Sequence, residues 1–168
     1  IAGVPGRVQV YAIERKPEAV ELLRKNRAQF HMDNIQIIET PAPEGLEELP
    51  VPTHAFIGGS GGRLMDILQV LYRKNPHMRI VINAISMETI AELKEVLDTF
   101  PVEEEEILQM QVSRVKKLLS YHLPQAENPV WICSFTFRET GKDPMDNSKK
   151  TKPGAEETDN GKNGEVQR

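Results

Sequence analysis

The sequence contains, at residues 53–85, the stretch THAFIGGSGGRLMDILQVLYRKNPHMRIVINAI. A β-prone run at 53–57 leads into five residues, 58–62, of which four are glycine. Four apolar residues then recur with the helical period, at Leu64, Ile67, Leu68 and Leu71. Residues 79–85 form a nearly continuous apolar run, typical of a strand buried on both faces. The order strand, glycine loop, helix, strand predicts a parallel βαβ unit.

The same alternation continues on both sides of this unit. The further predicted elements are strands at 8–13 and 34–39 and helices at 17–30 and 87–100. Pro17 suits a first helical position. The apolar positions that fit one face of the first helix are Ala19, Leu22, Leu23 and Phe30. Strands alternating with helices of this length predict an α/β fold with a parallel sheet.

The rhythm changes after Phe100. Two β-rich segments, 107–115 and 129–137, follow one another with an irregular stretch between them. Two successive strands without a helix predict a terminal antiparallel pair.

The composition excludes several classes of protein. A single cysteine, Cys133, excludes an intramolecular disulfide framework and a cysteine-rich zinc site. No apolar run approaches the roughly 20 residues of a membrane helix. The start at Ile1 is neither a signal peptide nor a methionine, which indicates a cut end. We therefore expect a cytoplasmic protein without a membrane segment.

The chain divides into two parts of unlike composition. Residues 138–168 contain no Leu, Ile, Phe, Tyr, Trp or Cys, which predicts a disordered polar tail. The tail holds seven basic and seven acidic residues, so residues 1–137 carry the whole net charge of −4. Because a polyanion-binding domain is normally basic, nucleic acid is a poor candidate partner.

Two strand ends in the first half are candidate ligand contacts, because ligands of open α/β sheets bind beyond the carboxyl ends of the strands. Glu14 follows the first strand, where a carboxylate can accept hydrogen bonds from both ribose hydroxyls; a solvated charge is the alternative. Ala42 lies between two prolines after the second strand. Its N–H could meet a planar heterocycle, and a rigid turn is the simpler interpretation.

The glycine loop 58–62 follows the third strand. Backbone without side chains can approach a ligand closely, so this loop favours a binding role over flexibility. It is not a phosphate loop, because Arg63 and Leu64 stand where that motif has Lys and Ser or Thr.

The stretch between the last two predicted strands is the remaining candidate. It gathers cations, an aromatic ring, a histidine and an amide that could bind several carboxylates. A solvated loop is the alternative. The residues concerned are Ser113, Arg114, Lys116, Lys117, Tyr121, His122, Asn128 and Trp131. No cluster has the spacing of metal ligands, and no serine or cysteine lies in a nucleophile motif.

Four segments together resemble one enzyme family, the decarboxylating precorrin methyltransferases of cobalamin biosynthesis. They are VYAIERKPEAVELLRKN (10–26), ETPAPEGL (39–46), AFIGGSGG (55–62) and SRVKKLLSYHLPQAENPVWI (113–132). The family occurs as a separate subunit or as the carboxy-terminal half of precorrin-6Y 5,15-methyltransferase. The resemblance covers residues 1–137 and implies a class I S-adenosylmethionine-dependent methyltransferase, a Rossmann-like α/β sheet ending in an antiparallel hairpin.

The resemblance also implies a reaction and its site. The reaction is methylation of carbon 15 of a precorrin or cobalt-precorrin, with loss of carbon dioxide from the ring C acetate, by a homo-oligomer, a tetramer in the family. Glu14 matches the residue that binds the cofactor ribose, Ala42 the residue at the adenine, and Gly58 and Gly59 further cofactor contacts. The implied tetrapyrrole contacts are Ser60, Gly61, Gly62, Ser113, Arg114, Tyr121, His122 and Asn128.

The sequence departs from the family pattern at several places. Thr40 and Pro41 replace a glycine and an acid, and His54 replaces an aspartate. The glycine-rich motif that follows the family's first strand is absent. We therefore expect a fragment of a longer chain, which could have a second methyltransferase domain upstream. Without the family's first strand, the strand that ends at Glu14 and the strand that leads into the glycine loop should lie about 10 Å apart. The chain as given is then expected to be inactive because its cofactor site is incomplete, and micromolar binding of S-adenosylmethionine by this chain would contradict the expectation that half of that site is missing.

Two other interpretations stay open at this point. The chain could be a class I methyltransferase for another substrate, such as RNA or a small metabolite. It could also be a non-catalytic nucleotide-binding or assembly module that kept the sheet and lost the chemistry.

Overall fold

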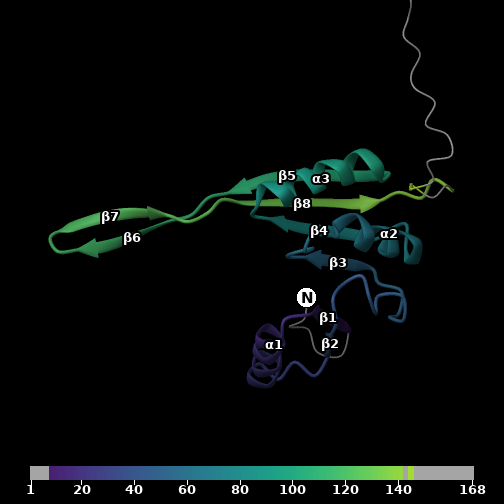
Figure 1. Cartoon of the computed structure of the whole chain (residues 1–168), viewed down its shortest axis with the longest axis horizontal. Helices are drawn as coiled ribbons and strands as arrows, with labels where there is room; N and C mark the ends of the chain where they lie inside the picture. The colour runs from purple at the N-terminus through teal and green to yellow at the C-terminus, as the bar shows by residue number, and fades with distance from the viewer. Residues whose placement is uncertain (1–7, 142–143, 146–168) are drawn as a thin grey trace, which may run out of the picture.

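Helices connect parallel strands in the first part of the protein (Figure 1). The computed structural model describes residues 8–141 and 144–145. Its first elements, in chain order, are β1 (Val10–Glu14), α1 (Pro17–Gln29), β2 (Ile35–Glu39), β3 (His54–Ile57), α2 (Leu64–Lys74), β4 (Arg79–Ala84) and α3 (Met87–Thr99). The α/β alternation expected from the sequence is confirmed.

The larger sheet has four strands in the order β3, β4, β8, β5, where β5 is Val102–Met110 and β8 is Val130–Phe137. β3 pairs parallel with β4, while β8 is antiparallel to both β4 and β5. The predicted antiparallel pair is therefore confirmed. Its return strand β8 lies between β4 and β5, a position that the order of elements along the chain does not predict.

β1 and β2 form a separate parallel ladder, from Val10 opposite Ile35 to Glu14 opposite Glu39. α1 connects these two strands, which lie beyond the β3 edge of the larger sheet in Figure 1. No backbone ladder joins β1 to β3 within residues 8–141. Side chains link the two parts, since Ile13 of β1 packs against the main core.

The stretch predicted to be irregular is a β-hairpin, and that expectation was wrong. β6 (Ser113–Leu118) pairs antiparallel with β7 (Tyr121–Ala126) across a two-residue turn, in which Leu119 has a φ of 55°. Every residue of both strands is exposed, and Figure 1 shows the hairpin extending away from the body. Without a buried face, the hairpin has no apolar alternation that a sequence pattern could reveal.

The predicted strand at 107–115 also differs from the structure. β5 ends at Met110 and β6 begins at Ser113, so the predicted segment spans the end of one strand and the start of the next. The register of β5 against β8 shifts between Glu103 and Glu106, within a run of four exposed glutamates. Such irregularities and charges protect an edge strand from pairing with another chain.

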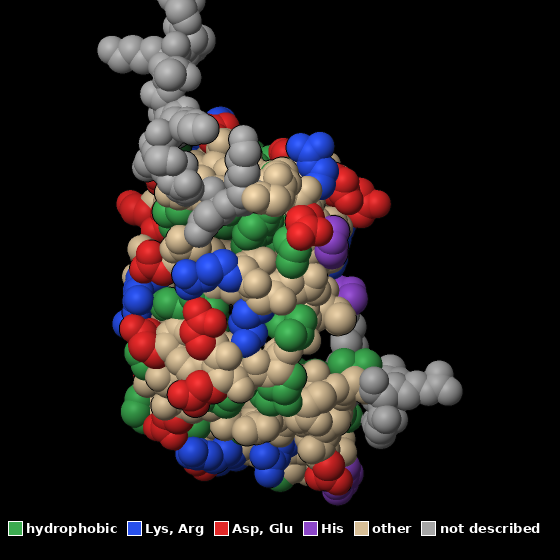
Figure 2. All heavy atoms as spheres, turned by 90° about the vertical axis from the view of Figure 1, so that its right-hand side faces the viewer, with side chains coloured by type: hydrophobic (Ala, Val, Ile, Leu, Met, Phe, Trp, Pro, Cys, Tyr) green, Lys and Arg blue, Asp and Glu red, His purple; other side chains and the backbone are tan. Residues whose placement is uncertain are grey.

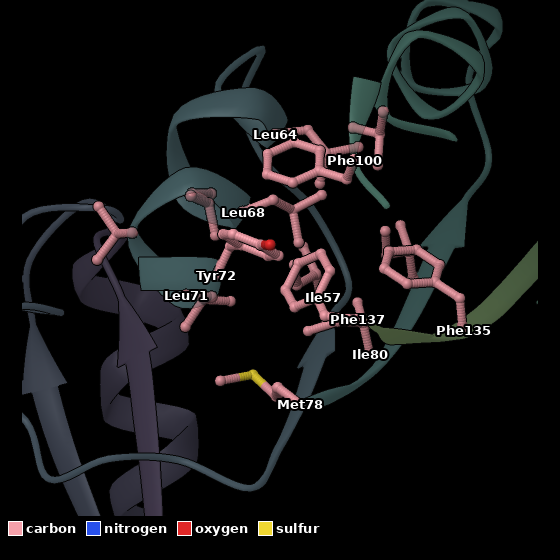
Figure 3. Packing of buried hydrophobic residues seen from close by; sticks show 14 of the residues in the cluster. Ile57, Leu64, Leu68, Leu71, Tyr72, Met78, Ile80, Phe100, Phe135 and Phe137 are labelled. Carbon is pink, nitrogen blue, oxygen red and sulfur yellow. The ribbon is translucent and has the colours of Figure 1, made fainter. Parts of the chain in front are cut away.

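The main core lies between α2, α3 and the larger sheet (Figure 3). Alternate residues of β8 are fully buried, namely Cys133, Phe135 and Phe137. Phe137 meets Tyr72 edge to face at 5.2 Å and lies 5.5 Å from Phe100 between ring centroids. The predicted helix face at 64, 67, 68 and 71 is confirmed, because all four side chains are buried.

Two expectations about burial were wrong. In β4 only the residues on one face are buried, namely Ile80, Ile82 and Ala84, so β4 has one packed face and one half-buried face. In α1 the buried residue is Val20, whereas Leu22 and Phe30 are 57% and 59% exposed. In both places the sequence pattern predicted a buried surface that the rest of the protein covers only in part, namely the second face of β4 and the predicted apolar face of α1.

Arg138, the first residue after the predicted boundary at residue 137, is hydrogen-bonded to the body. The Arg138 N–H donates to the Pro101 carbonyl at 2.9 Å, and the Tyr72 hydroxyl donates to the Arg138 carbonyl at 3.3 Å. The greater part of the predicted tail, residues 142–143 and 146–168, lies outside the described residues.

The face of the molecule shown in Figure 2 has mixed charge. On the face shown in Figure 2, acidic and basic side chains are interspersed with apolar ones, so this face has no extended patch of one sign. Among the helices in the described ranges, none is long and apolar enough to cross a membrane.

Candidate functional site at the carboxyl edge of the strands

The ends of β1, β2 and β3 meet at one edge of the molecule. The Thr40 N–H, just after β2, donates to the Glu14 carbonyl at 3.1 Å. The Arg15 guanidinium, just after β1, lies 3.5 Å from the point where a Cβ on Gly61 would be. The structure therefore brings Glu14, the Ala42 segment and the glycine loop 58–62 to a common edge.

The Glu14 carboxylate is held by the backbone that follows it. Its Oε1 accepts hydrogen bonds from the N–H groups of Arg15 at 2.8 Å and Lys16 at 2.9 Å. Lys16 is the N-cap of α1, and its own side chain makes no capping bond. Glu14 thus fixes the start of α1, while Oε2 keeps lone pairs for a ligand.

Ala42 belongs to a loop anchored in the core. Its peptide bond to Pro43 is cis, and the Leu46 N–H donates to the Pro43 carbonyl at 3.0 Å. The Leu46 side chain is buried in the main cluster. The Lys74 ammonium of α2 donates to the carbonyls of Glu47 and Leu49 at 2.8 and 2.7 Å. These contacts hold the loop that carries Ala42 against α2.

An ion pair joins this loop to the end of the glycine loop. The Arg63 Nη1 donates to both carboxylate oxygens of Glu44, at 2.6 and 2.9 Å, and Nε donates to Asp66 at 3.3 Å. The Arg63 hydrogen bond lowers the pKa of Glu44, and Glu44 in turn raises the pKa of Arg63. The pair therefore links the two loops that meet at the common edge.

We expect acid to remove the stabilising contribution of this pair. Because the pKa of Glu44 in the folded protein lies below its ordinary value of 4.5, the contribution is complete above that value and is lost as the pH falls through the folded-state pKa. Urea unfolding should show that the wild type is more stable than Glu44→Gln near about pH 7, and that the difference shrinks as the pH is lowered below 4.5. A difference that persists in acid contradicts this role. The effect is small, since the pair is exposed to solvent.

The glycine loop requires glycine at two positions and is open on one side. Gly61 and Gly62 have φ values of +61° and +81°, which L side chains rarely adopt. A Cβ added at Gly59 would meet no atom within 4 Å. On the protein side, the Ser60 Oγ donates to Oε2 of Glu92 in α3 at 3.0 Å. The loop is therefore supported from α3 and accessible from solvent.

The late candidates are the implied tetrapyrrole contacts after residue 110, namely Ser113, Arg114, Tyr121, His122 and Asn128. The structure does not bring these five residues together. Directly opposed residues of a hairpin share a face, so the pairing of Lys117 with His122 and of Leu118 with Tyr121 assigns the faces. One face carries Ser113 and His122, and the opposite face carries Arg114 and Tyr121. Arg114 is ion-paired with Glu127, and Asn128 follows the hairpin.

The hairpin extends from the same edge as the glycine loop. At its base Met110 pairs with Val130, and Trp131 pairs with Ala84, the last residue of β4. Because β3 runs parallel to β4, the loop after β3 leaves the sheet in the same direction as the hairpin. The late candidates and the glycine loop thus lie at the same edge of the sheet.

The sequence analysis did not identify three residues of this edge, namely Glu44, Arg63 and Glu92. Glu44 and Arg63 are 19 residues apart in the chain, and Glu92 is 32 residues from its partner Ser60, so no local spacing marks them. The described residues contain no group of His, Cys, Asp or Glu that could hold a metal ion. Burial raises the pKa of the Cys133 thiol to about 11, so this group is a neutral core side chain at neutral pH.

Comparison with known families identifies the kind of domain. Residues 5–136 match the family model described as precorrin methyltransferase domain. The chain belongs to this family. The match covers most of the residues that the structure describes, including the hairpin.

Curated relatives of this precorrin methyltransferase domain have consistent names. It is 36% identical over 141 residues to the probable cobalt-precorrin-6B C(15)-methyltransferase (decarboxylating) of Methanothermobacter thermautotrophicus, with 82% of this chain and 73% of the relative covered. It is 31% identical over 126 residues to the cobalt-precorrin-6B C(15)-methyltransferase (decarboxylating) of Salmonella typhimurium, with 74% and 65% covered.

Solved structures agree with the family and the fold. The precorrin-6y C5,15-methyltransferase of Geobacter metallireducens has a TM-score of 0.69 at 32% identity, covering 77% of this chain and 67% of that one. The precorrin 8w decarboxylase of Methanobacterium thermoautotrophicum has a TM-score of 0.67 at 34% identity, covering 76% and 69%. A SAM-dependent O-methyltransferase of Thermotoga maritima, with a TM-score of 0.60 at 13% identity, shares the fold alone. The precorrin methyltransferase domain has the class I methyltransferase fold.

Proposed function

We propose that the natural protein containing this chain methylates carbon 15 of a precorrin or cobalt-precorrin and removes carbon dioxide from the ring C acetate, in cobalamin biosynthesis. The observation that carries the proposal is the common edge, where Glu14 and the glycine loop lie together in a chain 36% identical to a relative named for this activity. A biosynthetic enzyme of this kind fits the cytoplasm.

The cofactor of the proposal is S-adenosylmethionine, and the residues present at the edge fit it. Glu14 is half-buried with Oε2 available to the ribose, Ala42 lies in an anchored loop suited to the adenine, and Gly58 and Gly59 are exposed. A Cβ at Gly59 would project into open space, which indicates room for a ligand. The cofactor supplies a methyl group on a sulfonium, and the protein's task is to align it with the substrate carbon.

The substrate of the proposal is a tetrapyrrole that carries several carboxylates. Ser60, Gly61 and Gly62 form the floor beneath it, at the accessible side of the loop. Of the two hairpin faces, we assign it the one with Ser113 and His122, which also carries Lys117. Asn128 lies at the base of the hairpin. Arg114 and Tyr121 lie on the other face and have another role in this proposal.

The deciding experiment uses the complete natural protein with S-adenosylmethionine and cobalt-precorrin-6B under anaerobic conditions. Mass spectrometry should show a product that has gained one methyl group and lost one carbon dioxide. A methylated product that keeps all its carboxylates, or no product, overturns the proposed reaction. RNA and small metabolites serve as control substrates and should stay unmethylated.

We also propose that the chain self-associates through its hairpin. An isolated two-stranded hairpin is marginally stable in water. The face that carries Arg114 and Tyr121 exposes Leu118, Tyr121 and Leu123 by 60%, 68% and 47%. The hairpin cations and the exposed glutamates 103–106 of β5 have opposite charges, which suits docking onto a second copy.

Two matched variants test this association. Leu123→Asp places a charge on the proposed interface, while Val115→Asp places the same charge on the opposite face, where Val115 is 65% exposed. In light scattering after size exclusion, the wild type and Val115→Asp should be oligomers of the same mass, and Leu123→Asp should be smaller. A monomeric wild type, or equal behaviour of the two variants, contradicts the assignment.

A further inference from the structure

Glu92 of α3 supports the glycine loop from the side of the protein. Its Oε2 accepts the hydrogen bond from the Ser60 Oγ at 3.0 Å, and its Oε1 lies 3.7 Å from the point where a Cβ on Gly62 would be. The carboxylate is half-buried between α3 and the loop. Both of its oxygens therefore face the loop that forms the floor of the proposed site.

This contact determines the hydrogen-bonding character of Ser60. A carboxylate only accepts hydrogen bonds, and a serine hydroxyl has a single hydrogen to donate. Since that hydrogen is directed to Glu92, Ser60 presents only lone pairs to a ligand above the loop. Ser60 can then accept a hydrogen bond from a ligand but cannot donate one.

The charges around the loop are unevenly distributed. The Arg15 guanidinium lies beside Gly61, whereas the Glu92 carboxylate lies beside Ser60 and Gly62. The loop thus has a guanidinium beside Gly61 and a carboxylate beside Ser60 and Gly62. At Ser60, the Glu92 carboxylate favours a ligand group that is protonated or carries an N–H, and disfavours a carboxylate.

We propose that the Ser60–Glu92 pair makes this part of the site selective for a nitrogen donor of the ligand, with Glu92 as a positioning residue acting through Ser60. The inference rests on the proposed function. Two sources share the required chemistry, the ammonium group of the cofactor's methionine portion and a pyrrole N–H of a metal-free precorrin.

Calorimetry of the complete natural protein separates the two sources. S-Adenosylhomocysteine carries the ammonium group, and 5′-methylthioadenosine lacks it. If the ammonium is the donor, Ser60→Ala and Glu92→Ala should each weaken binding of S-adenosylhomocysteine by about tenfold, the scale of a hydrogen bond to a charged group. Binding of 5′-methylthioadenosine should not change. If a pyrrole N–H is the donor, both variants should instead raise the KM for a metal-free precorrin about tenfold.

Further variants separate a positioning role from a merely structural one. Glu92→Gln keeps an amide oxygen that accepts the Ser60 hydrogen, so it should retain more affinity than Glu92→Ala. The double variant Ser60→Ala, Glu92→Ala should be no weaker than either single one, since both remove one interaction. Glu95→Ala, an exposed acid on the same helix, is the control and should bind like the wild type.

The results that would overturn the inference are distinct from those that refute the proposed function. Unchanged affinity and unchanged KM in both single variants overturn it, as does a defect in Ser60→Ala that Glu92→Ala lacks. Equal loss of affinity for both nucleosides also overturns it, because that indicates general damage to the site. A wild-type protein that binds S-adenosylhomocysteine but does not act on the tetrapyrrole refutes the proposed reaction alone.

Discussion

Replacing Phe137 by alanine is expected to lower the free energy of unfolding by about 3 to 5 kcal/mol. The side chain is fully buried at the end of β8 and contacts three other aromatic rings, those of Tyr72, Phe100 and Phe135, with centroids 5.2 to 5.5 Å away. Its removal leaves a cavity between α2, the end of α3 and the sheet, which the neighbouring rings can fill only in part. Urea unfolding of both proteins measures the difference.

A matched control comes from β3. Phe56 is 67% exposed, so Phe56→Ala should cost less than about 1 kcal/mol. Equal losses in the two variants would contradict the view that the aromatic cluster at Phe137 stabilises the sheet. A loss below about 1 kcal/mol in Phe137→Ala would show that the site collapses around the smaller side chain.

Replacing Glu14 by alanine is expected to weaken binding of S-adenosylmethionine by about 1 to 3 kcal/mol, or roughly 5- to 150-fold. In the proposed site the Glu14 carboxylate accepts hydrogen bonds from the ribose, and a charged acceptor makes such bonds strong. Calorimetric titration of the complete natural protein measures the change. Unchanged affinity would refute the ribose role.

Glu14 also has a structural role, which the experiment has to separate from binding. Its Oε1 holds the N–H groups of Arg15 and Lys16 at the start of α1. Glu14→Gln keeps an oxygen for these donors, so it should lose affinity with less effect on stability than Glu14→Ala. Glu18→Ala changes an exposed acid in the first turn of the same helix and should leave the affinity unchanged.

The strands and helices that carry the site were largely predictable from local sequence. The helical period at 64, 67, 68 and 71 and the strand at residues 79–84 are encoded by neighbouring residues, and both are found in the structure. Glu14 and the glycine loop were recognisable because each directly follows a β-prone run. Convergence at one edge follows from parallel strands, whose carboxyl ends point the same way.

The hairpin and the support of the glycine loop were not predictable in this way. β6 and β7 have no buried face, so no apolar alternation marks them, and the two faces separate Ser113 and His122 from Arg114 and Tyr121. The support from Glu92 depends on how α3 packs beside the loop. The predicted apolar face of α1 was wrong, because the residue that the tertiary packing buries is Val20.

The sequence by itself determined the α/β alternation, the family resemblance and the residues at the strand ends, because backbone preference and apolar period depend on residues close in the chain. The tertiary structure alone decided that β8 lies between β4 and β5, that Arg63 joins Glu44, and that Ser60 donates to Glu92. The physical reason is distance along the chain. Contacts between residues 19 or 32 positions apart form only once strands and helices have packed, and packing is a property of the whole core.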